Sequence, residues 1–152
     1  MLIKGRCHCG NIALELEWAS DPREMPARAC GCSFCVKHGA VWTSDPGSRV
    51  AVTIGDPSLV SKYGFGSGTA VFHVCARCGA VPLVTSEIEN HVYAVVNVNV
   101  LDDIDAHALR RAATNFDGEN VESRLARRKR GWIADVRIMQ RRASIDAGPD
   151  AS

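Results

Sequence analysis

Apolar and polar residues alternate along much of the first hundred positions, which is the pattern of half-buried β-strands. Between positions 11 and 18 every second residue is large and apolar, from Ile12 through Leu14 and Leu16 to Trp18. Further segments with strand-like composition lie at 41–43, 49–54, 59–63, 69–74, 81–85 and 92–100. Short turns rich in Gly, Pro and Asp separate them, so the pattern predicts a meander of antiparallel strands.

The periodicity changes after position 101. Ile104, Ala108 and Ala112 recur at helical spacing, which predicts one short helix there. Asp117 or Asn120 is a suitable cap for a second helix. We therefore expect a mainly β fold of short antiparallel strands with one or two short C-terminal helices.

Length and composition favour one domain. The 152 residues are 46% hydrophobic and 23% charged, as in an ordinary globular domain. We expect that domain to span residues 1–140, with a polar and frayed tail over 141–152.

Charge and apolar content restrict the class of partner. A formal net charge of +1 gives no bulk attraction to nucleic acid or to an anionic membrane. The first residues lack the apolar region of a secretion signal, and no apolar run approaches the length of a membrane span. We expect a cytoplasmic protein with no membrane partner, and we do not expect it to bind nucleic acid.

Seven cysteines form three clusters, and in a reducing compartment clustered cysteines indicate metal ligands before disulfides. The clusters are Cys7-His8-Cys9-Gly10, Cys30-Gly31-Cys32-Ser33-Phe34-Cys35 and Cys75-Ala76-Arg77-Cys78-Gly79. An odd count leaves one thiol over if all pair as disulfides. Two metal sites with four and three thiols use every cysteine.

A CxxC pair followed by glycine is a zinc knuckle, which supplies two of the four ligands that tetrahedral zinc needs. Cys75 and Cys78 fit this description. Cys7 and Cys9 can supply the other two, giving a closed structural site that contributes folding free energy. The alternative is that Cys7 and Cys9 are only buried thiols.

The middle cluster of Cys30, Cys32 and Cys35 offers three thiols, which leaves one tetrahedral position open, as in catalytic zinc sites. In one alternative the fourth ligand is a histidine, and the candidates are His8, His38 and His73. In another, Cys32 and Cys35 form a redox pair, although no βαβ pattern surrounds them. Zinc held by three thiolates suits the capture of an exogenous thiol better than the activation of water.

The ordered set of motifs, CxCG, CxCxxC, CxxCG and the segment Val96-Asn97-Val98-Asn99-Val100-Leu101-Asp102-Asp103, resembles the glutathione-dependent formaldehyde-activating enzyme (GFA) family. The resemblance implies an Mss4-like zinc fold of short coiled sheets with two zinc ions per chain. It assigns a structural zinc to Cys7, Cys9, Cys75 and Cys78. It assigns a catalytic zinc to Cys30, Cys32 and Cys35.

The same resemblance implies an activity. A glutathione-like thiol would add to a small aldehyde such as formaldehyde, the reaction of a carbon–sulfur lyase that forms S-(hydroxymethyl)glutathione. Two features depart from the family pattern. Gly31 stands where a histidine is usual, a role that His38 could take over, and the part from 115 to 142 is unlike the usual family ending.

A basic run near the C-terminus has two interpretations. It comprises Arg124, Arg127, Arg128, Lys129 and Arg130. It could bind a phosphate backbone or the carboxylates of a glutathione-like ligand, but a solvated helix face is the favoured interpretation. Arg28 and Lys37 flank the middle cysteines and are better placed for a small anion. The alternative function is a zinc-stabilised binding module with two structural zincs and no catalysis.

Overall fold

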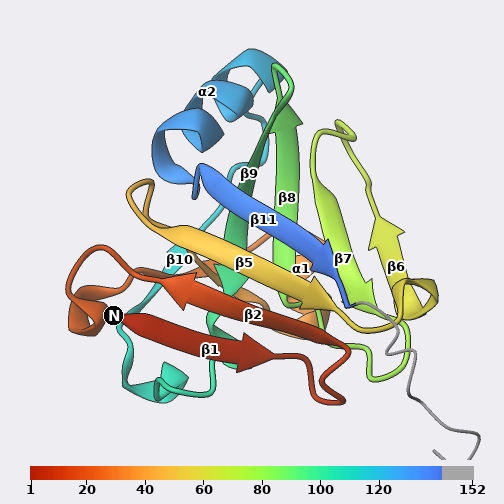
Figure 1. Ribbon diagram of the computed structural model, residues 1–152. Helices are drawn as coiled ribbons and strands as arrows, with labels where there is room; N and C mark the ends of the chain where they lie inside the picture. Colours follow the sequence, from red (N-terminus) through yellow and green to blue (C-terminus); the bar gives the residue numbers. More distant parts are fainter. Residues whose placement is uncertain (142–152) are drawn as a thin grey trace, which may run out of the picture.

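Eleven strands form two sheets in residues 1–141, the part of the chain that the computed structural model describes (Figure 1). In chain order the elements are β1 (Leu2–Arg6), β2 (Ile12–Glu17), β3 (Ala27–Cys30), α1 (Cys35–His38), β4 (Val41–Thr43), β5 (Arg49–Ile54), β6 (Val60–Tyr63), β7 (Val71–Cys75), β8 (Leu83–Ile88), β9 (His91–Asn97), β10 (Arg111–Thr114), α2 (Val121–Gly131) and β11 (Asp135–Gln140). Short 3-10 helices lie at Pro22–Glu24, Pro57–Leu59, Val98–Val100 and Ala106–Ala108. The expected mainly β class is confirmed.

The smaller sheet has the strand order β1-β2-β5-β11. Its strands pair antiparallel except β11, which runs parallel to β5. The alternation in β2 places Ile12, Leu14 and Leu16 in the core and leaves Glu15 and Glu17 exposed. One face of this sheet is therefore apolar and must pack against a second layer.

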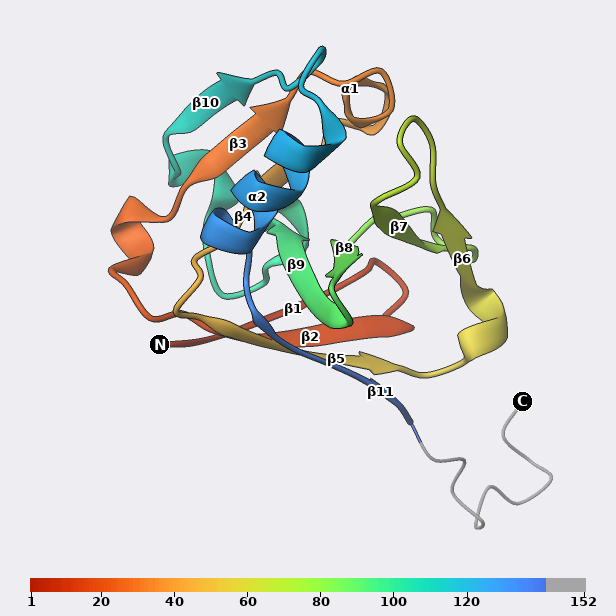
Figure 2. The same cartoon turned by 90° about the horizontal axis from the view of Figure 1, so that it is seen from above.

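The larger sheet has seven strands in the order β10-β3-β4-β9-β8-β7-β6. Only the edge pair β10 and β3 is parallel. In Figure 2 the smaller sheet lies along one side of the molecule, while α2 lies over the larger sheet on the other side. The larger sheet is thus the middle layer.

Both faces of the larger sheet are buried around β8 and β9. Leu83 and Val96 belong to the main core shared with the smaller sheet. The neighbouring residues Val84 and Val95 point to the other face, where they join a second core with Trp42. Burial on both faces explains why these strands have almost continuous apolar sequences.

A close backbone approach fixes β1 against the segment that follows β9. Gly5 in β1 forms an isolated bridge with Leu101, and a Cβ at position 5 would lie 2.6 Å from the carbonyl oxygen of Val100. Only glycine permits this contact. The contact positions the end of β1, where the first cysteine cluster begins.

Two expectations about the segment after β9 were wrong. The strand expected over 92–100 ends at Asn97, because the Asn97 side chain accepts a hydrogen bond from the N–H of Asn99 and begins a 3-10 helix. The helix expected around Ile104–Ala112 is also absent: one 3-10 turn is followed by β10, whose pairing with β3 replaces helical hydrogen bonds. Apolar residues at helical spacing over so short a stretch favour a helix only weakly. Pairing with the free edge of a sheet stabilises the segment more.

The second predicted helix is confirmed as α2. The Asn120 side chain accepts a hydrogen bond of 2.8 Å from the N–H of Ser123 and caps its start. Apart from Arg141, the expected tail over 141–152 falls outside the described residues. No helix among residues 1–141 has the length and apolar character needed to span a membrane.

Candidate metal centres

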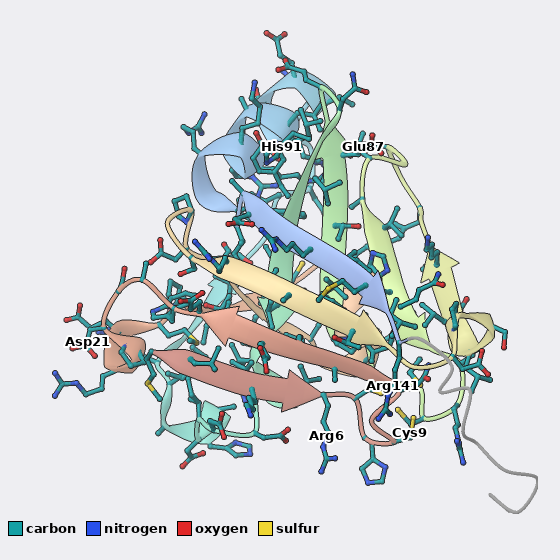
Figure 3. The ribbon with its side chains drawn as sticks, viewed as in Figure 1. Arg6, Cys9, Asp21, Glu87, His91 and Arg141 are labelled. Atoms are coloured by element: carbon teal, nitrogen blue, oxygen red, sulfur yellow. The ribbon has the colours of Figure 1, made fainter. Side chains whose placement is uncertain are left out.

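The first and third cysteine clusters come together at one end of the two sheets. Cys7 and Cys9 lie in the loop between β1 and β2, and Cys75 and Cys78 lie at the end of β7 and in the turn after it. All four sulfurs are within 4.8 Å of one another. Figure 3 shows Cys9 at the edge of the molecule. The buried-thiol alternative for Cys7 and Cys9 does not describe this arrangement, because Cys9 is exposed and both face the other pair.

The separations between these sulfurs fit a tetrahedral ion. Cys9 Sγ lies 3.8 Å from Cys7 Sγ and 3.5 Å from Cys75 Sγ. Zinc–sulfur bonds of about 2.3 Å in a tetrahedron require sulfur–sulfur separations of about 3.8 Å. The four thiols, called here the four-thiol cluster, can therefore hold a zinc ion with little movement.

Both turns of the four-thiol cluster end in a glycine that closes the backbone around the sulfurs, although only Cys75–Gly79 has the CxxC spacing of a zinc knuckle. Gly10 and Gly79 adopt positive φ angles of 85° and 81°, which favour glycine. Their N–H groups donate to the carbonyl oxygens of Cys7 and Cys75 over 3.0 Å and 2.8 Å. The N–H of Ile12 donates to Cys7 Sγ over 3.3 Å. The backbone thus turns tightly around the sulfurs.

The environment of this cluster calls for a cation. Burial raises the pKa of the Cys7 thiol to about 12. Burial also acts to raise the pKa of Cys78, but backbone hydrogen bonds from Ala80 and Cys9 and the neighbouring thiols lower it to about 6. Four thiolates this close together are stable only around a positive ion.

The middle cysteines also converge, within a single short segment. Cys30 ends β3, Cys32 lies in the following turn, Cys35 begins α1, and the three sulfurs lie within 4.8 Å of one another. We call them the three-thiol cluster. The N–H of Gly31 donates to the carbonyl oxygen of Thr114 over 2.8 Å, which ties this turn to the end of β10.

Two N–H donors serve the sulfurs of the three-thiol cluster. The backbone N–H of Cys35 donates to Cys32 Sγ, and the Trp42 indole N–H donates to Cys35 Sγ, each over 3.3 Å. A hydrogen bond from Cys35 lowers the pKa of Cys30 to about 5, and the same hydrogen bond, together with burial, raises the pKa of Cys35. The cluster therefore carries a thiolate at neutral pH, as a metal site requires.

No histidine completes the three-thiol cluster. Among residues 1–141, no fourth His, Cys, Asp or Glu has a ligand atom within 4.8 Å of all three sulfurs. The His38 ring packs on Phe34 at 4.5 Å between centroids, His73 is hydrogen-bonded to Thr85, and His8 belongs to the other cluster's loop. The expectation that His38 could take the place of the family histidine at position 31 finds no contact to support it.

The indole of Trp42 provides a test of the three-thiol cluster. Trp42→Phe removes the N–H donor to Cys35 while keeping an aromatic ring in the second core, so zinc binding at this cluster is expected to weaken by about 10- to 100-fold. Competition with a chromophoric chelator measures the affinity. Trp18→Phe is the matched control, because the Trp18 indole N–H is buried without a hydrogen-bond partner. Equal affinities for both variants would show that the Trp42 hydrogen bond does not support the cluster.

A cavity of about 280 Å³ opens beside the three-thiol cluster. The larger sheet supplies an apolar wall to this cavity, with Trp42, Phe72, Val84 and Val95. The loops around it add Phe65 and Phe116. An apolar hollow with a few polar groups is the usual form of a small-molecule site.

The opposite wall is cationic and comes from α2. Arg124, Arg127 and Arg128 line the cavity, together with Arg28 of β3, and Asp117 is the one acidic residue among the described residues of the lining. The favoured interpretation of the basic run as a solvated helix face was therefore wrong for the three arginines of α2 that line the cavity. It holds only for the exposed Lys129 and Arg130. The spacing of the three arginines at i, i+3 and i+4, which places them on one helix face, was the signal that could have indicated this wall. Lys37, also expected near an anion, is exposed and does not line the cavity.

Comparisons with known proteins agree with the motifs. Residues 2–117 match the family model described as glutathione-dependent formaldehyde-activating enzyme. The chain is also similar to the crystal structure of a Rhodobacter sphaeroides protein, with 28% sequence identity and a TM-score of 0.54, over 72% of this chain and 97% of that one. No curated protein matches the chain at a significant level. The family match includes both cysteine clusters and ends before α2.

Proposed function

The chain belongs to the glutathione-dependent formaldehyde-activating enzyme family, and from this premise we propose that it is a zinc-dependent carbon–sulfur lyase. In this proposal a glutathione-like thiol adds to a small aldehyde such as formaldehyde. The sulfur forms a bond to the carbonyl carbon, and the thiol proton ends on the carbonyl oxygen, so no oxidant or reductant is needed.

We assign different roles to the two clusters. The four-thiol cluster would hold a structural zinc, because its four ligands fill a tetrahedron and connect the smaller sheet to the larger one. The three-thiol cluster would hold a catalytic zinc through Cys30, Cys32 and Cys35. When bound there, zinc supplies a Lewis acid that lowers the pKa of an incoming thiol from about 8.5, so that it binds as the thiolate.

The residues of the chain contribute orientation and shielding. The Trp42 indole holds Cys35 through its hydrogen bond, and the backbone N–H of Cys35 holds Cys32. The aromatic wall of the cavity keeps bulk water away from the reacting groups, which strengthens polar interactions inside it. The arginine wall attracts a negatively charged ligand.

The cavity beside the three-thiol cluster is the observation that carries this proposal. In a binding module with two structural metals, a small-molecule cavity against one metal site has no role. Here Cys30, Cys32 and Cys35 are all among the residues that line that cavity. This favours an enzyme over the module that the sequence left as the alternative.

Calorimetric titration of the zinc-loaded protein with glutathione tests the proposal. We expect saturable binding of one equivalent, and much weaker binding of S-methylglutathione, which keeps the carboxylates of glutathione but whose blocked sulfur cannot bind as a thiolate. With formaldehyde present, NMR exchange spectroscopy is expected to show faster formation of S-(hydroxymethyl)glutathione than in buffer. Binding of both compounds with equal affinity, or a rate equal to that in buffer, would contradict the proposed activity.

A further inference from the structure

Arg128 is a buried cation that makes no direct ion pair with any of the described residues. Its side chain is only 8% exposed, and its Nη1 donates to the hydroxyls of Thr69 and Ser86 over 2.8 Å and 3.1 Å. Its Nε is buried with no hydrogen-bond partner, and its guanidinium lies 5.0 Å from the centroid of the Trp132 ring. Removing a charge from water without pairing it is costly, so such groups commonly serve a ligand.

Arg28 reaches the same cavity from β3. Its guanidinium donates to the hydroxyl of Ser44, and it is half-buried. Among residues 1–141, no carboxylate lies within ion-pairing distance of Arg28 or Arg128. All three hydrogen bonds go to neutral hydroxyls, so neither guanidinium has a direct ion pair, and Glu119 acts on Arg128 only at longer range.

The other two arginines of this wall are already neutralised in part. Glu119 lies 3.0 Å from Arg127 and 3.5 Å from Arg124. The guanidinium of Arg127 also stacks on Phe116 at 3.5 Å from the ring centroid. These contacts fix the wall, and they leave Arg28 and Arg128 as the groups that can receive an anion.

The apolar wall of the cavity, which faces the arginines, restricts the kind of anion that can bind. It is formed by the aromatic and aliphatic side chains of the larger sheet, with the three-thiol cluster beside it. A one-carbon aldehyde such as formaldehyde would use neither this wall nor the guanidiniums. A ligand with an apolar body and one carboxylate would use both, because the planar fork of arginine matches a carboxylate.

We propose that Arg128 and Arg28 form a carboxylate subsite, so that this protein takes as its carbonyl substrate an aldehyde that carries a carboxylate on an apolar chain or ring. The assignment of this ligand as a substrate rests on the proposed function, whereas the subsite itself does not. The subsite uses α2, which lies beyond the residues that match the family.

A non-reactive pair of ligands tests the subsite on the zinc-loaded protein. We expect 3-phenylpropionate to bind at least about tenfold more tightly than its uncharged amide in calorimetry, since hydrogen bonds to a charged group contribute that much. The chain has three tryptophans, of which Trp42 and Trp132 line the cavity and Trp18 does not. In NMR spectra the acid is expected to shift the indole N–H signals of Trp42 and Trp132 and to leave that of Trp18 unchanged.

Variants identify the groups responsible. Arg128→Gln is expected to remove the preference for the acid over the amide, and Arg28→Gln is expected to reduce it. If Arg128→Gln does not fold, Arg28→Gln still tests the subsite. Arg130→Gln is the matched control, because Arg130 is an exposed arginine on the same helix and its loss changes the net charge equally. Equal binding of acid and amide, or an equal effect of Arg130→Gln and Arg128→Gln, would overturn the subsite.

This experiment is independent of the reaction, because 3-phenylpropionate carries neither a thiol nor an aldehyde. If glutathione fails to bind but the acid binds through Arg128, the proposed lyase activity is wrong and the subsite stands. If glutathione is captured but the acid does not bind, the subsite is wrong and the lyase activity stands.

Discussion

Replacing Cys75 with serine is expected to leave the protein largely unfolded at 25 °C. Structural zinc sites contribute apparent binding free energies on the order of 10 kcal/mol, comparable with the whole stability of a domain. The Cys75 side chain is fully buried, and its sulfur lies 3.5 Å from that of Cys9. The substitution therefore breaks the connection between β7 of the larger sheet and the loop after β1 of the smaller one.

Thermal unfolding followed by circular dichroism measures this effect, with the wild-type protein treated with a zinc chelator as the comparison. The variant and the metal-free protein are expected to show the same loss of cooperative unfolding. A Cys75→Ser variant that melts within about 4 °C of the zinc-loaded wild type would mean a loss of only about 1 to 2 kcal/mol. That result would exclude a structural role for the four-thiol cluster.

The features that the sequence predicted correctly are those set by local constraints. The alternation from Ile12 to Trp18 gave β2, because a strand with one buried face has a period of two whatever lies around it. The grouping of cysteines followed from counting ligands, since a knuckle supplies two and needs two more. Both constraints hold before any tertiary contact is known.

The arginine wall was missed because burial in α2 does not follow hydrophobicity. Val121 is 47% exposed in this helix, whereas Arg128 is 8% exposed. The helix places a polar face over the cavity, and its apolar residues are too few to show which side faces the protein. Only the position of α2 over the larger sheet, with Trp132 and Ser86 against Arg128, reveals that the basic side is the inner one.

β10 was missed for a related reason. Arg111–Thr114 has three exposed residues out of four and no alternation of apolar residues, so nothing in its own sequence favours a strand. It forms because β3 presents an unpaired edge, and parallel pairing with that edge satisfies its backbone groups. This pairing brings Thr114 beside Gly31, where a Cβ would lie 3.3 Å from the Thr114 carbonyl oxygen. A side chain at position 31 would therefore make a tight contact with this backbone oxygen.

Cys32→Ser is expected to have the opposite profile to Cys75→Ser, with a retained fold and no thiol capture. The three-thiol cluster lies within one segment from the end of β3 to α1, so its metal connects no distant strands and contributes little to folding. A serine hydroxyl is not deprotonated at neutral pH, and the two remaining thiolates would bind zinc far more weakly. We expect glutathione binding in calorimetry to fall at least about 100-fold, and elemental analysis to give one zinc per chain rather than two.

The melting temperature is expected to stay within about 4 °C of the wild type. Retention of both zinc ions with unchanged glutathione binding would show that the thiol binds elsewhere, and a melting loss equal to that of Cys75→Ser would show that the three-thiol cluster is structural.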